Sequence, residues 1–370
     1  MEGTAAVSQE EAFARIRLLR SPNVGPVIYA QLLARFGSAV HAIGALPDLA
    51  SRSGKAYTCA SERRISDEIA AVRKAGARYL FHDAPEYPTL LAAIEGAPPI
   101  LIVRGDAAVM AQPCVALVGA RNASAAAVRL ARDFAYDLAA QGWVVVSGLA
   151  RGIDGAAHRG ALGAGEGATI GVIASGIDVT YPPEHRELQE EIATRGVLVA
   201  EQPPGTEPLA RHFPARNRII AGLCAGTVIV EAAPRSGSLI TARLAGEMGR
   251  EVMAVPGSPL DARSHGCNQL IRDGAVLVQS AADVIELLTG FTGQPRSHFR
   301  EQQPGWSAPP TSPTGADPAD VTALLTTAPI AVDELVRQSG ASTASVQLAL
   351  LELELAGGLV RHAGGRVSRG

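Results

Sequence analysis

The chain is poor in cysteine, in aromatic residues and in lysine. Its four cysteines, spread over 370 residues, form no C-x-x-C pair, which argues against a disulfide framework and against a zinc ribbon. No apolar run approaches the roughly 18 residues that span a bilayer, and acidic residues stand where a signal peptide would be basic. These absences predict a cytoplasmic protein without membrane contact, and we expect no metal and no other cofactor.

The charge balance also excludes one class of nucleic-acid-binding protein. A net charge of −3 and a pI of about 6.3 argue against a protein that coats nucleic acid through bulk positive charge. Lysine occurs only at Lys55 and Lys74, so nearly all of the basic side chains are arginines. Hydrophobic residues make up 47% of the chain, enough for sizeable cores, and the length predicts two or three domains at about 150 residues each. Any nucleic-acid site should therefore be local.

The pattern of apolar residues predicts three folded regions and a linker. Helical spacing with Gly and Pro breaks predicts a helical domain over 8–78. From 79 to 289, β-branched runs alternate with helical stretches, which predicts a doubly wound α/β domain with a mostly parallel sheet. The segment 290–317 is rich in Pro, Gly, Ser and Thr and predicts a flexible linker. The predicted strands of the α/β domain are 115–119, 143–148, 169–175, 197–201, 227–232, 252–257 and 275–280.

The last region, 318–370, predicts a winged helix. Its helices are followed by a short β tail, and Ser339-Gly340-Ala341-Ser342 supplies the turn of a helix-turn-helix. Six acidic residues against one arginine between 317 and 360 make a poor surface for duplex phosphates. We therefore favour a protein-interaction or regulatory role for this region over the reading of duplex DNA.

Two strand-to-helix loops in the α/β domain could hold phosphates. The first is VALVGARNAS, where a strand ends at Gly119 and a helix begins near Ser124, so that helix amides point to the carboxyl edge of the sheet. Arg121 could bind a phosphate there, or pair with a nearby carboxylate. The second begins at Ser147, and its glycines, Gly148 and Gly152 among them, allow a close backbone approach.

The second loop also carries two residues that could act chemically. Asp154 is well placed as the N-cap of the helix that carries His158. His158 could serve as a base or a phosphate donor, although a lone helical histidine is more often a packed one. No G-x-S-x-G motif surrounds Ser147, so a serine nucleophile is not indicated.

The third and most informative stretch runs from 201 to 245. Basic residues interleaved with Phe213 make a plausible platform for single-stranded nucleic acid, with arginines on phosphates and the ring stacked on a base. The alternative is a structural cluster that pairs with Glu201, Glu207 and Glu231. Farther along, Ser236, Gly237 and Ser238 precede a helix expected to begin near Leu239, which makes a second anion cradle.

Several motifs in series resemble one known family. VALVGARNAS, SGLARGIDGAAH, IASGIDVTYPPEH, FPARNRIIAGL, EAAPRSGSLITARLA and VMAVPGSP occur in the order typical of the DNA-processing protein A family, also called Smf. The resemblance implies an extended Rossmann-like domain that binds and protects incoming single-stranded DNA, acts as a homodimer and loads RecA recombinase in natural transformation. It implies no catalytic activity.

The resemblance also assigns residues to the DNA site. It implies a sterile-alpha-motif-like or helix-hairpin-helix domain at the N-terminus, where Asn23-Val24-Gly25-Pro26 matches a hairpin whose amides can meet a phosphate. It is also consistent with a winged helix at the C-terminus. Together with the residue patterns it gives this set of candidate DNA- and phosphate-binding residues: Gly119, Arg121, Ser147, Gly148, Gly152, Arg211, Phe213, Arg216, Asn217, Arg218, Ser236, Gly237 and Ser238.

An enzyme of the same superfamily is the alternative. Phosphoribohydrolases that cleave nucleoside monophosphates carry the motif P-G-G-x-G-T-x-x-E on the corresponding strand and helix. This chain keeps Gly226, Thr227 and Glu231 but lacks the leading P-G-G. We therefore place a nucleotide-processing enzyme second to a non-catalytic DNA-binding protein.

Overall fold

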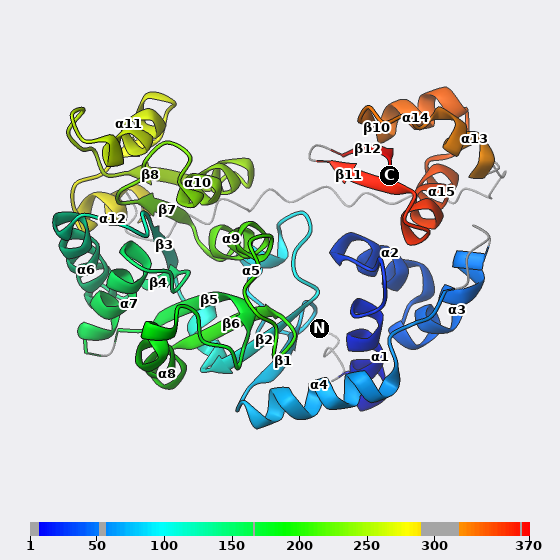
Figure 1. Ribbon diagram of the computed structural model, residues 1–370, viewed down its shortest axis with the longest axis horizontal. Helices are drawn as coiled ribbons and strands as arrows, with labels where there is room; N and C mark the ends of the chain where they lie inside the picture. The colour runs from blue at the N-terminus through cyan, green and yellow to red at the C-terminus, as the bar shows by residue number, and fades with distance from the viewer. Residues whose placement is uncertain (1–6, 52–56, 166, 290–317, 363–364) are drawn as a thin grey trace. The chain divides into compact units, whose positions relative to one another are not determined.

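The computed structural model describes residues 7–51, 57–165, 167–289, 318–362 and 365–370 (Figure 1). They divide into two compact units, and the division falls within one helix. The helical unit contains Met1–Ser66 and Glu301–Gly370, and the α/β unit contains Asp67–Arg300. The predicted linker, 290–317, lies outside the described residues.

The α/β unit is built on a mixed sheet. Nine strands among its described residues have the order β1-β2-β6-β5-β4-β3-β7-β8-β9. β2 pairs antiparallel with both β1 and β6, and the other neighbours pair in parallel. The predicted fold class, a doubly wound and mostly parallel sheet, is therefore confirmed. The strands are β1 Arg78–Phe81, β2 Ile100–Gly105, β3 Cys114–Val118, β4 Val144–Ser147, β5 Thr169–Gly176, β6 Val197–Gln202, β7 Gly226–Ile229, β8 Glu251–Ala254 and β9 Val276–Leu277.

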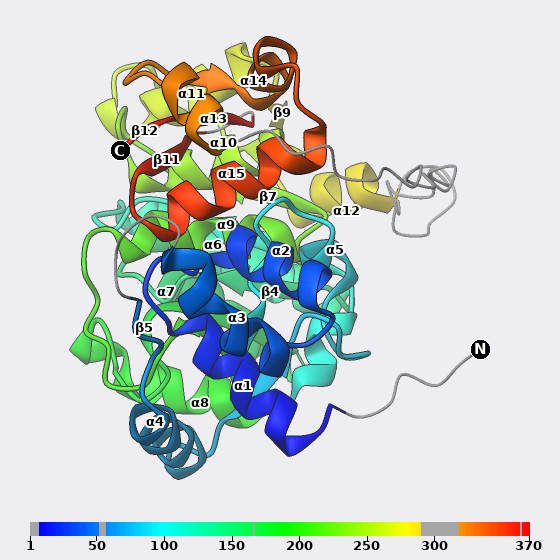
Figure 2. The same ribbon diagram turned by 90° about the vertical axis from the view of Figure 1, so that its right-hand side faces the viewer.

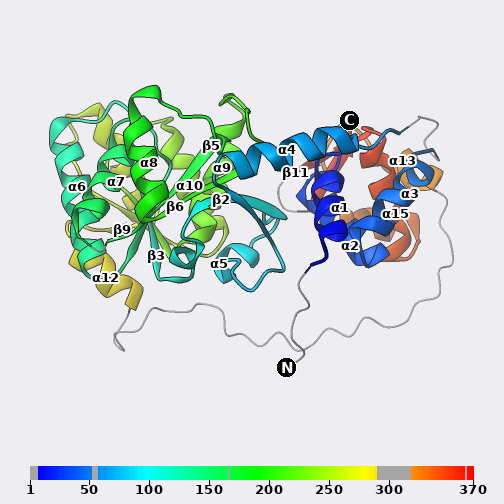
Figure 3. The same cartoon turned by 90° about the horizontal axis from the view of Figure 1, so that it is seen from below.

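Helices cover both faces of this sheet because the central strands are apolar on both sides. Ala116 and Val118 of β3 pack on one face with α5, α9, α10 and α11, whereas Val115 and Leu117 pack on the other with α6, α7 and α12. Figure 3 shows α8 on one side of the sheet and α5 on the other. The helices are α5 Thr89–Ala92, η1 Ala107–Ala111, α6 Ala125–Ala140, α7 Ile153–Gly163, η2 Pro183–His185, α8 Arg186–Arg195, α9 His212–Leu223, α10 Gly237–Glu247, η3 Ala262–Ser264, α11 His265–Arg272 and α12 Ala281–Thr289.

The N-terminal helices start and stop at the residues that capping chemistry favours. Ser8 caps the first helix by accepting a hydrogen bond from the Glu11 amide, and Gly37 ends the second in a left-handed conformation. The stretch LPDLASRSG predicts a third helix from Leu46, whereas the observed third helix begins seven residues earlier, at Ala39, and includes Pro47. The helices are α1 Gln9–Leu19, α2 Pro26–Phe36, α3 Ala39–Ser51 and α4 Glu62–Lys74.

The C-terminal part of the helical unit, residues 318–370, has the order of elements of a winged helix, and we call it the C-terminal module. Its β-strands form a small antiparallel sheet, β10-β12-β11, and all three strands are labelled in Figure 1. The predicted turn at 339–342 joins its second and third helices. The elements are α13 Pro318–Leu324, β10 Ile330–Ala331, α14 Val332–Ser339, α15 Thr343–Leu355, β11 Leu359–His362 and β12 Arg366–Arg369.

The state of the cysteines and the length of the apolar helices can be checked in the described part of the chain. The four cysteines are free thiols, and three of them are buried. Among the described helices, none is long and apolar enough to cross a membrane.

Candidate nucleic-acid interface

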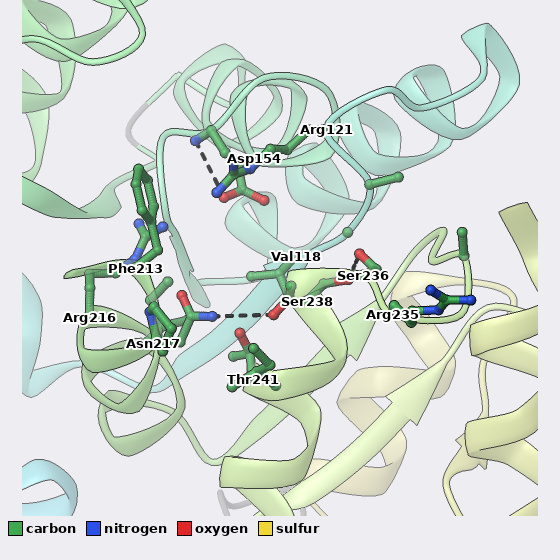
Figure 4. A pocket seen from close by; sticks show the side chains of 18 of the residues that line it. Val118, Arg121, Asp154, Phe213, Arg216, Asn217, Arg235, Ser236, Ser238 and Thr241 are labelled. Carbon is green, nitrogen blue, oxygen red and sulfur yellow. Dashed lines mark hydrogen bonds between the residues drawn. The ribbon is translucent and has the colours of Figure 1, made fainter. Parts of the chain in front are cut away.

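A cleft of about 860 Å³ opens at the carboxyl ends of the central strands, and we call it the β3–β7 cleft. The loops after β3, β4 and β7 and the first turns of α9 and α10 line it (Figure 4). β3 and β7 are neighbours in the sheet although three other strands separate them in the chain. In open α/β sheets, such a reversal of strand order leaves a crevice in which ligands bind.

The structure brings most of the predicted site residues to this cleft. Eight of them line it: Gly119, Arg121, Phe213, Arg216, Asn217, Ser236, Gly237 and Ser238. The other five, Ser147, Gly148, Gly152, Arg211 and Arg218, lie outside the lining. Figure 4 shows Phe213, Arg216 and Asn217 together on the α9 side and Arg235 on the loop that leads into α10.

Arg121 and Phe213 form a stacked pair at the rim of the cleft. The Arg121 guanidinium carbon lies 4.8 Å from the centroid of the Phe213 ring, and the Tyr181 ring meets Phe213 edge-on at 5.8 Å. Arg121 is exposed, and no ion pair within 4.0 Å joins it to a described carboxylate, although its charge acts on the buried carboxylate of Asp154. An exposed guanidinium beside a partly buried ring offers one group to a phosphate and one to a base.

The loop into α10 supplies an open anion cradle. Ser236 is the N-cap of α10, and its side chain makes no capping hydrogen bond to the helix, so the first amides of α10 keep their hydrogen-bonding capacity. The Ser236 and Ser238 hydroxyls lie 2.8 Å apart, and the Asn217 side chain donates to the Gly237 carbonyl at 3.3 Å. Exposed Arg235 precedes them with a φ of 75°. Helix amides, hydroxyls and a guanidinium together favour a phosphate group.

The other predicted cradle, at the start of α6, is filled by a side chain of the protein. The Ser124 amide donates to Glu231 at 2.9 Å, and the Ser124 hydroxyl donates to the second carboxylate oxygen at 2.7 Å. Ser124 is the N-cap of α6, as predicted, and accepts from the Ala127 amide. A buried carboxylate of the protein thus occupies the place at the Ser124 amide where the sequence predicts a phosphate.

Arg216 lies beneath the cleft and holds the loop after β4. It is 6% exposed, and its Nη1 donates to the Gly148 carbonyl at 2.6 Å and also to the Val172 carbonyl. Burial lowers the pKa of Arg216 to about 10, so the guanidinium stays protonated at neutral pH. A Cβ atom at Gly148 would lie 2.1 Å from Nη1 of Arg216, so a larger residue there would displace the guanidinium. Arg216 therefore binds backbone carbonyls, and its position gives it a structural role.

Asp154 belongs to the same buried group. Its carboxylate accepts from the amides of Gly148, at 3.2 Å, and Ala150, at 3.4 Å. Burial raises the pKa of Asp154, and the charge of Arg216 and the two amides oppose that rise. The predicted N-cap role is wrong: Gly152 is the N-cap of α7, and Asp154 lies in the first turn.

Gly152 and Ser147 support the loop after β3 that carries Arg121. Gly152 has a φ of +72°, and a Cβ atom there would lie 2.3 Å from the Ala120 carbonyl oxygen. The Ser147 hydroxyl donates to the Leu117 carbonyl of β3 at 2.6 Å. Both residues thus hold the segment that presents Arg121 without lining the cleft themselves.

The remaining two arginines separate into different environments. Arg218 forms an ion pair with Glu201, and both side chains are less than one fifth exposed, so the alternative of a structural pair is correct for this arginine. Arg211 is exposed directly before α9. Helical geometry therefore gives Arg211, Arg216 and Arg218 three different roles although they stand within eight positions.

His158 is a packed histidine. It is fully buried, and its Nδ1 lies 2.8 Å from the Thr169 hydroxyl. Burial is the largest cause that lowers its pKa to about 3, and the charges of His185 and Arg216 act in the same direction. These contacts match the packed alternative and not a base that faces the cleft.

This histidine predicts an acid-sensitive contribution to stability. The folded-state pKa, about 3, lies below the ordinary value of 6.5, so between these values the unfolded chain binds a proton that the folded chain does not. The contribution of neutral His158 to the free energy of unfolding should be complete above pH 6.5. Below pH 6.5 it should fall by roughly 1 kcal/mol per pH unit. Urea unfolding at several pH values should give a shallower pH dependence for His158→Gln than for wild type. If the free energy of unfolding depended on pH equally in both proteins below pH 6.5, His158 would not be the source of this acid sensitivity.

Sequence reasoning missed several residues that line the cleft. Tyr181 and Arg263 come from the loops after β5 and β8, where no phosphate-binding pattern marks them. Tyr181 stands in IASGIDVTYPPEH, so the series of family motifs was the signal that could have found it. Asn122 follows Arg121 directly, and Thr241 lies about one helical turn after Ser238.

Comparisons with known proteins identify similar sequences along most of the chain. Residues 78–289 match the model of the family described as DNA recombination-mediator protein A. Residues 9–71 match a DprA-like N-terminal HHH domain, and residues 306–365 match a DprA winged helix domain. The DNA processing protein DprA of Streptococcus pneumoniae is 48% identical over 199 residues, which cover 54% of this chain and 70% of that protein.

Solved structures show the same similarity. The X-ray structure of DNA processing protein A from Streptococcus pneumoniae has a TM-score of 0.63 and 38% identity, covering 74% of this chain and 96% of that one. DNA processing protein A from Helicobacter pylori, whose structure concerns its single-stranded DNA binding mode, has a TM-score of 0.52 and 28% identity. That match covers 58% of this chain and 97% of the Helicobacter chain.

Proposed function

The chain belongs to the DNA recombination-mediator protein A family, and from this premise we propose that it binds single-stranded DNA in the β3–β7 cleft without changing it chemically. The proposal is supported by the single-stranded DNA binding mode described for the Helicobacter pylori relative. Its central observation in this chain is the exposed Arg121 guanidinium stacked on Phe213 at the mouth of the cleft.

The proposed contacts divide between phosphates and bases. Arg121, Arg235 and the amides at the start of α10 bind consecutive phosphates, and Phe213 stacks on an unpaired base. Bases of a duplex are stacked on one another and cannot reach the ring, so the site prefers single strands. Exposed Arg211 extends the basic path along the start of α9.

The remaining expectations belong to the same proposal. The protein protects incoming single strands in the cytoplasm and loads RecA recombinase onto them in natural transformation. A homodimer joins two clefts, which lengthens the footprint on one strand and raises the overall affinity.

A titration of labelled oligothymidylate at several salt concentrations tests the binding proposal. We expect tighter binding of the single strand than of a hairpin duplex, and an affinity that falls as salt rises. The Arg121→Glu variant with Arg235→Glu should lower both the affinity and the salt dependence, because it removes two phosphate contacts. Binding unchanged by this double substitution would reject the cleft as the site.

The alternative of a phosphoribohydrolase has a direct test. Both carboxylate oxygens of Glu231, the glutamate retained from that motif, are bound by Ser124, and the side chain is only 7% exposed. Incubation with AMP should therefore release no adenine. Catalytic release of adenine would overturn the non-catalytic proposal.

A further inference from the structure

The third helix of the C-terminal module, α15, is apolar on two opposite sides. Val346, Ala349 and Leu350 lie on one side and pack into the core of the module itself. Leu351 and Leu355 lie on the opposite side, because an α-helix turns about 100° per residue. A helix that is apolar all round requires a partner on each side.

The N-terminal helices of the same unit supply the second partner. Leu351 and Leu355 are 3% and 2% exposed, and both belong to the hydrophobic core formed by α1, α2 and α3. α15 contacts α3 directly, and the two helices lie close together in Figures 1 and 2. The second face of α15 is therefore covered by residues about three hundred positions away in the sequence.

A polar contact holds the end of α15 in this position. The Asn23 side chain donates to the carbonyl of Leu355, the last residue of α15, at 2.8 Å. This carbonyl is among the four at the helix end that lack a partner within the helix. Asn23 has a φ of 60°, a left-handed conformation that asparagine adopts more readily than most residues.

The same contact lies at the Asn23–Pro26 hairpin, which the family resemblance implies as a phosphate contact and in which Asn23 and Gly25 remain exposed. A cavity of about 340 Å³ separates Asn23, Val24 and Gly25 from Glu354, Gly357 and Leu359. The space in front of the hairpin is thus bounded by the C-terminal end of a helix, which is unfavourable for a phosphate, and by Glu354, whose carboxylate pairs with Arg361 at 2.7 Å.

The position of α15 also determines whether it can act as a DNA-reading helix. In a helix-turn-helix the second helix enters the major groove, and α15 occupies that place after α14. We propose that the C-terminal module is an intramolecular cover of the N-terminal helices, docked through Leu351, Leu355 and Asn23, and not a reader of duplex DNA. Its partner is the α1–α3 core of the same chain, and docking places the end of α15 beside the Asn23–Pro26 hairpin.

Hydrogen exchange on the full chain tests the docking surface. In the Leu351→Glu variant with Leu355→Glu, we expect amides of α2 and α3 to exchange roughly tenfold faster or more, because their core loses its cover. Amides of α13, α14 and the α/β unit should keep their wild-type rates. The control is Ala344→Glu, an exposed position on the same helix, which should change none of them. Unchanged rates in α2 and α3 of the double variant would overturn the proposal.

A cross-link tests the partner without disturbing the core. An ideal Cβ atom at Gly357 would lie 3.8 Å from the Asn23 side-chain nitrogen, so cysteines at these positions should react with one short bismaleimide. The experiment uses Asn23→Cys and Gly357→Cys in a Cys59→Ser background, since the other three native cysteines are buried. A cross-linked species of monomer mass supports docking within one chain. A cross-link between two copies would overturn it, as would the absence of a cross-link in a variant whose α2 and α3 amides keep their wild-type exchange rates.

Discussion

Replacing Arg216 with methionine is expected to lower the free energy of unfolding of the α/β unit by about 3 kcal/mol or more. The substitution keeps most of the side-chain volume but leaves the buried carbonyls of Gly148 and Val172 without their donor. It also removes the positive charge that opposes the burial of Asp154. Urea unfolding followed by tryptophan fluorescence measures the change. A Trp306→Phe background makes the buried Trp143 the reporter of this unit.

The matched control for this prediction is Arg211→Met. Arg211 is exposed, so the same substitution should change the free energy of unfolding by no more than about 0.5 kcal/mol. It should instead reduce the slope of log K against log salt concentration for oligothymidylate binding by about 1, the change expected for the loss of one phosphate contact. Equal destabilisation by the two variants would contradict the division of the arginines into a buried support and an exposed contact.

The second large effect is expected at Phe213. Its replacement by alanine should weaken binding of oligothymidylate by about 1–3 kcal/mol, roughly 5- to 150-fold in Kd, because a base loses its stacking surface. Arg121 also loses the ring on which its guanidinium rests. Fluorescence anisotropy of a labelled oligonucleotide at fixed salt measures the loss.

Tyr136→Ala provides the control for an aromatic residue outside the cleft. Tyr136 is 48% exposed on α6 and is absent from the lining of the β3–β7 cleft, so its removal should leave the affinity unchanged. Equal affinities of wild type and Phe213→Ala would exclude base stacking on this ring.

The strands of the α/β unit could be predicted where burial dictates the residue pattern. The seven predicted apolar runs all contain strands, and in the middle of the sheet this is because a strand covered on both faces needs apolar, often β-branched residues at successive positions. The run at 275–280 forms only the edge strand β9, whose Val276 and Leu277 are exposed. β1 and β2 were missed. β1 has four residues, of which only Leu80 is buried. β2 was missed although residues 100–103 are a buried apolar run like the predicted ones, and only its antiparallel direction leaves no local mark.

Helix boundaries were predicted less well where unusual residues occupy a helix. Pro47 lies inside α3, whereas proline usually marks a helix start or a break, so the start at Ala39 was missed. α10 begins at Gly237, two residues before the predicted start, because Ser236 has the extended conformation of an N-cap. The domain boundaries at 8–78, 79–289 and 318–370 stay predictions.

The composition of the candidate site could be predicted, but not the part that each residue plays. The sequence groups Arg211, Arg216 and Arg218 as equivalent basic residues, whereas the structure buries one, pairs one with Glu201 and exposes one. The direction of a side chain on α9 depends on tertiary packing, which local pattern does not contain. The carboxylate of Glu231 reaches Ser124 from more than one hundred positions away, so local sequence could not reveal that this cradle is filled.

Photo-cross-linking of a short oligothymidylate that carries a photoreactive thymine analogue tests the central claim most directly. The cross-linked peptides, identified by mass spectrometry, should contain Phe213 and the loop with Arg121, and the Phe213 cross-link should vanish in Phe213→Ala. Cross-links confined to the N-terminal helices or the C-terminal module, with none from the residues that line the β3–β7 cleft, would contradict the account.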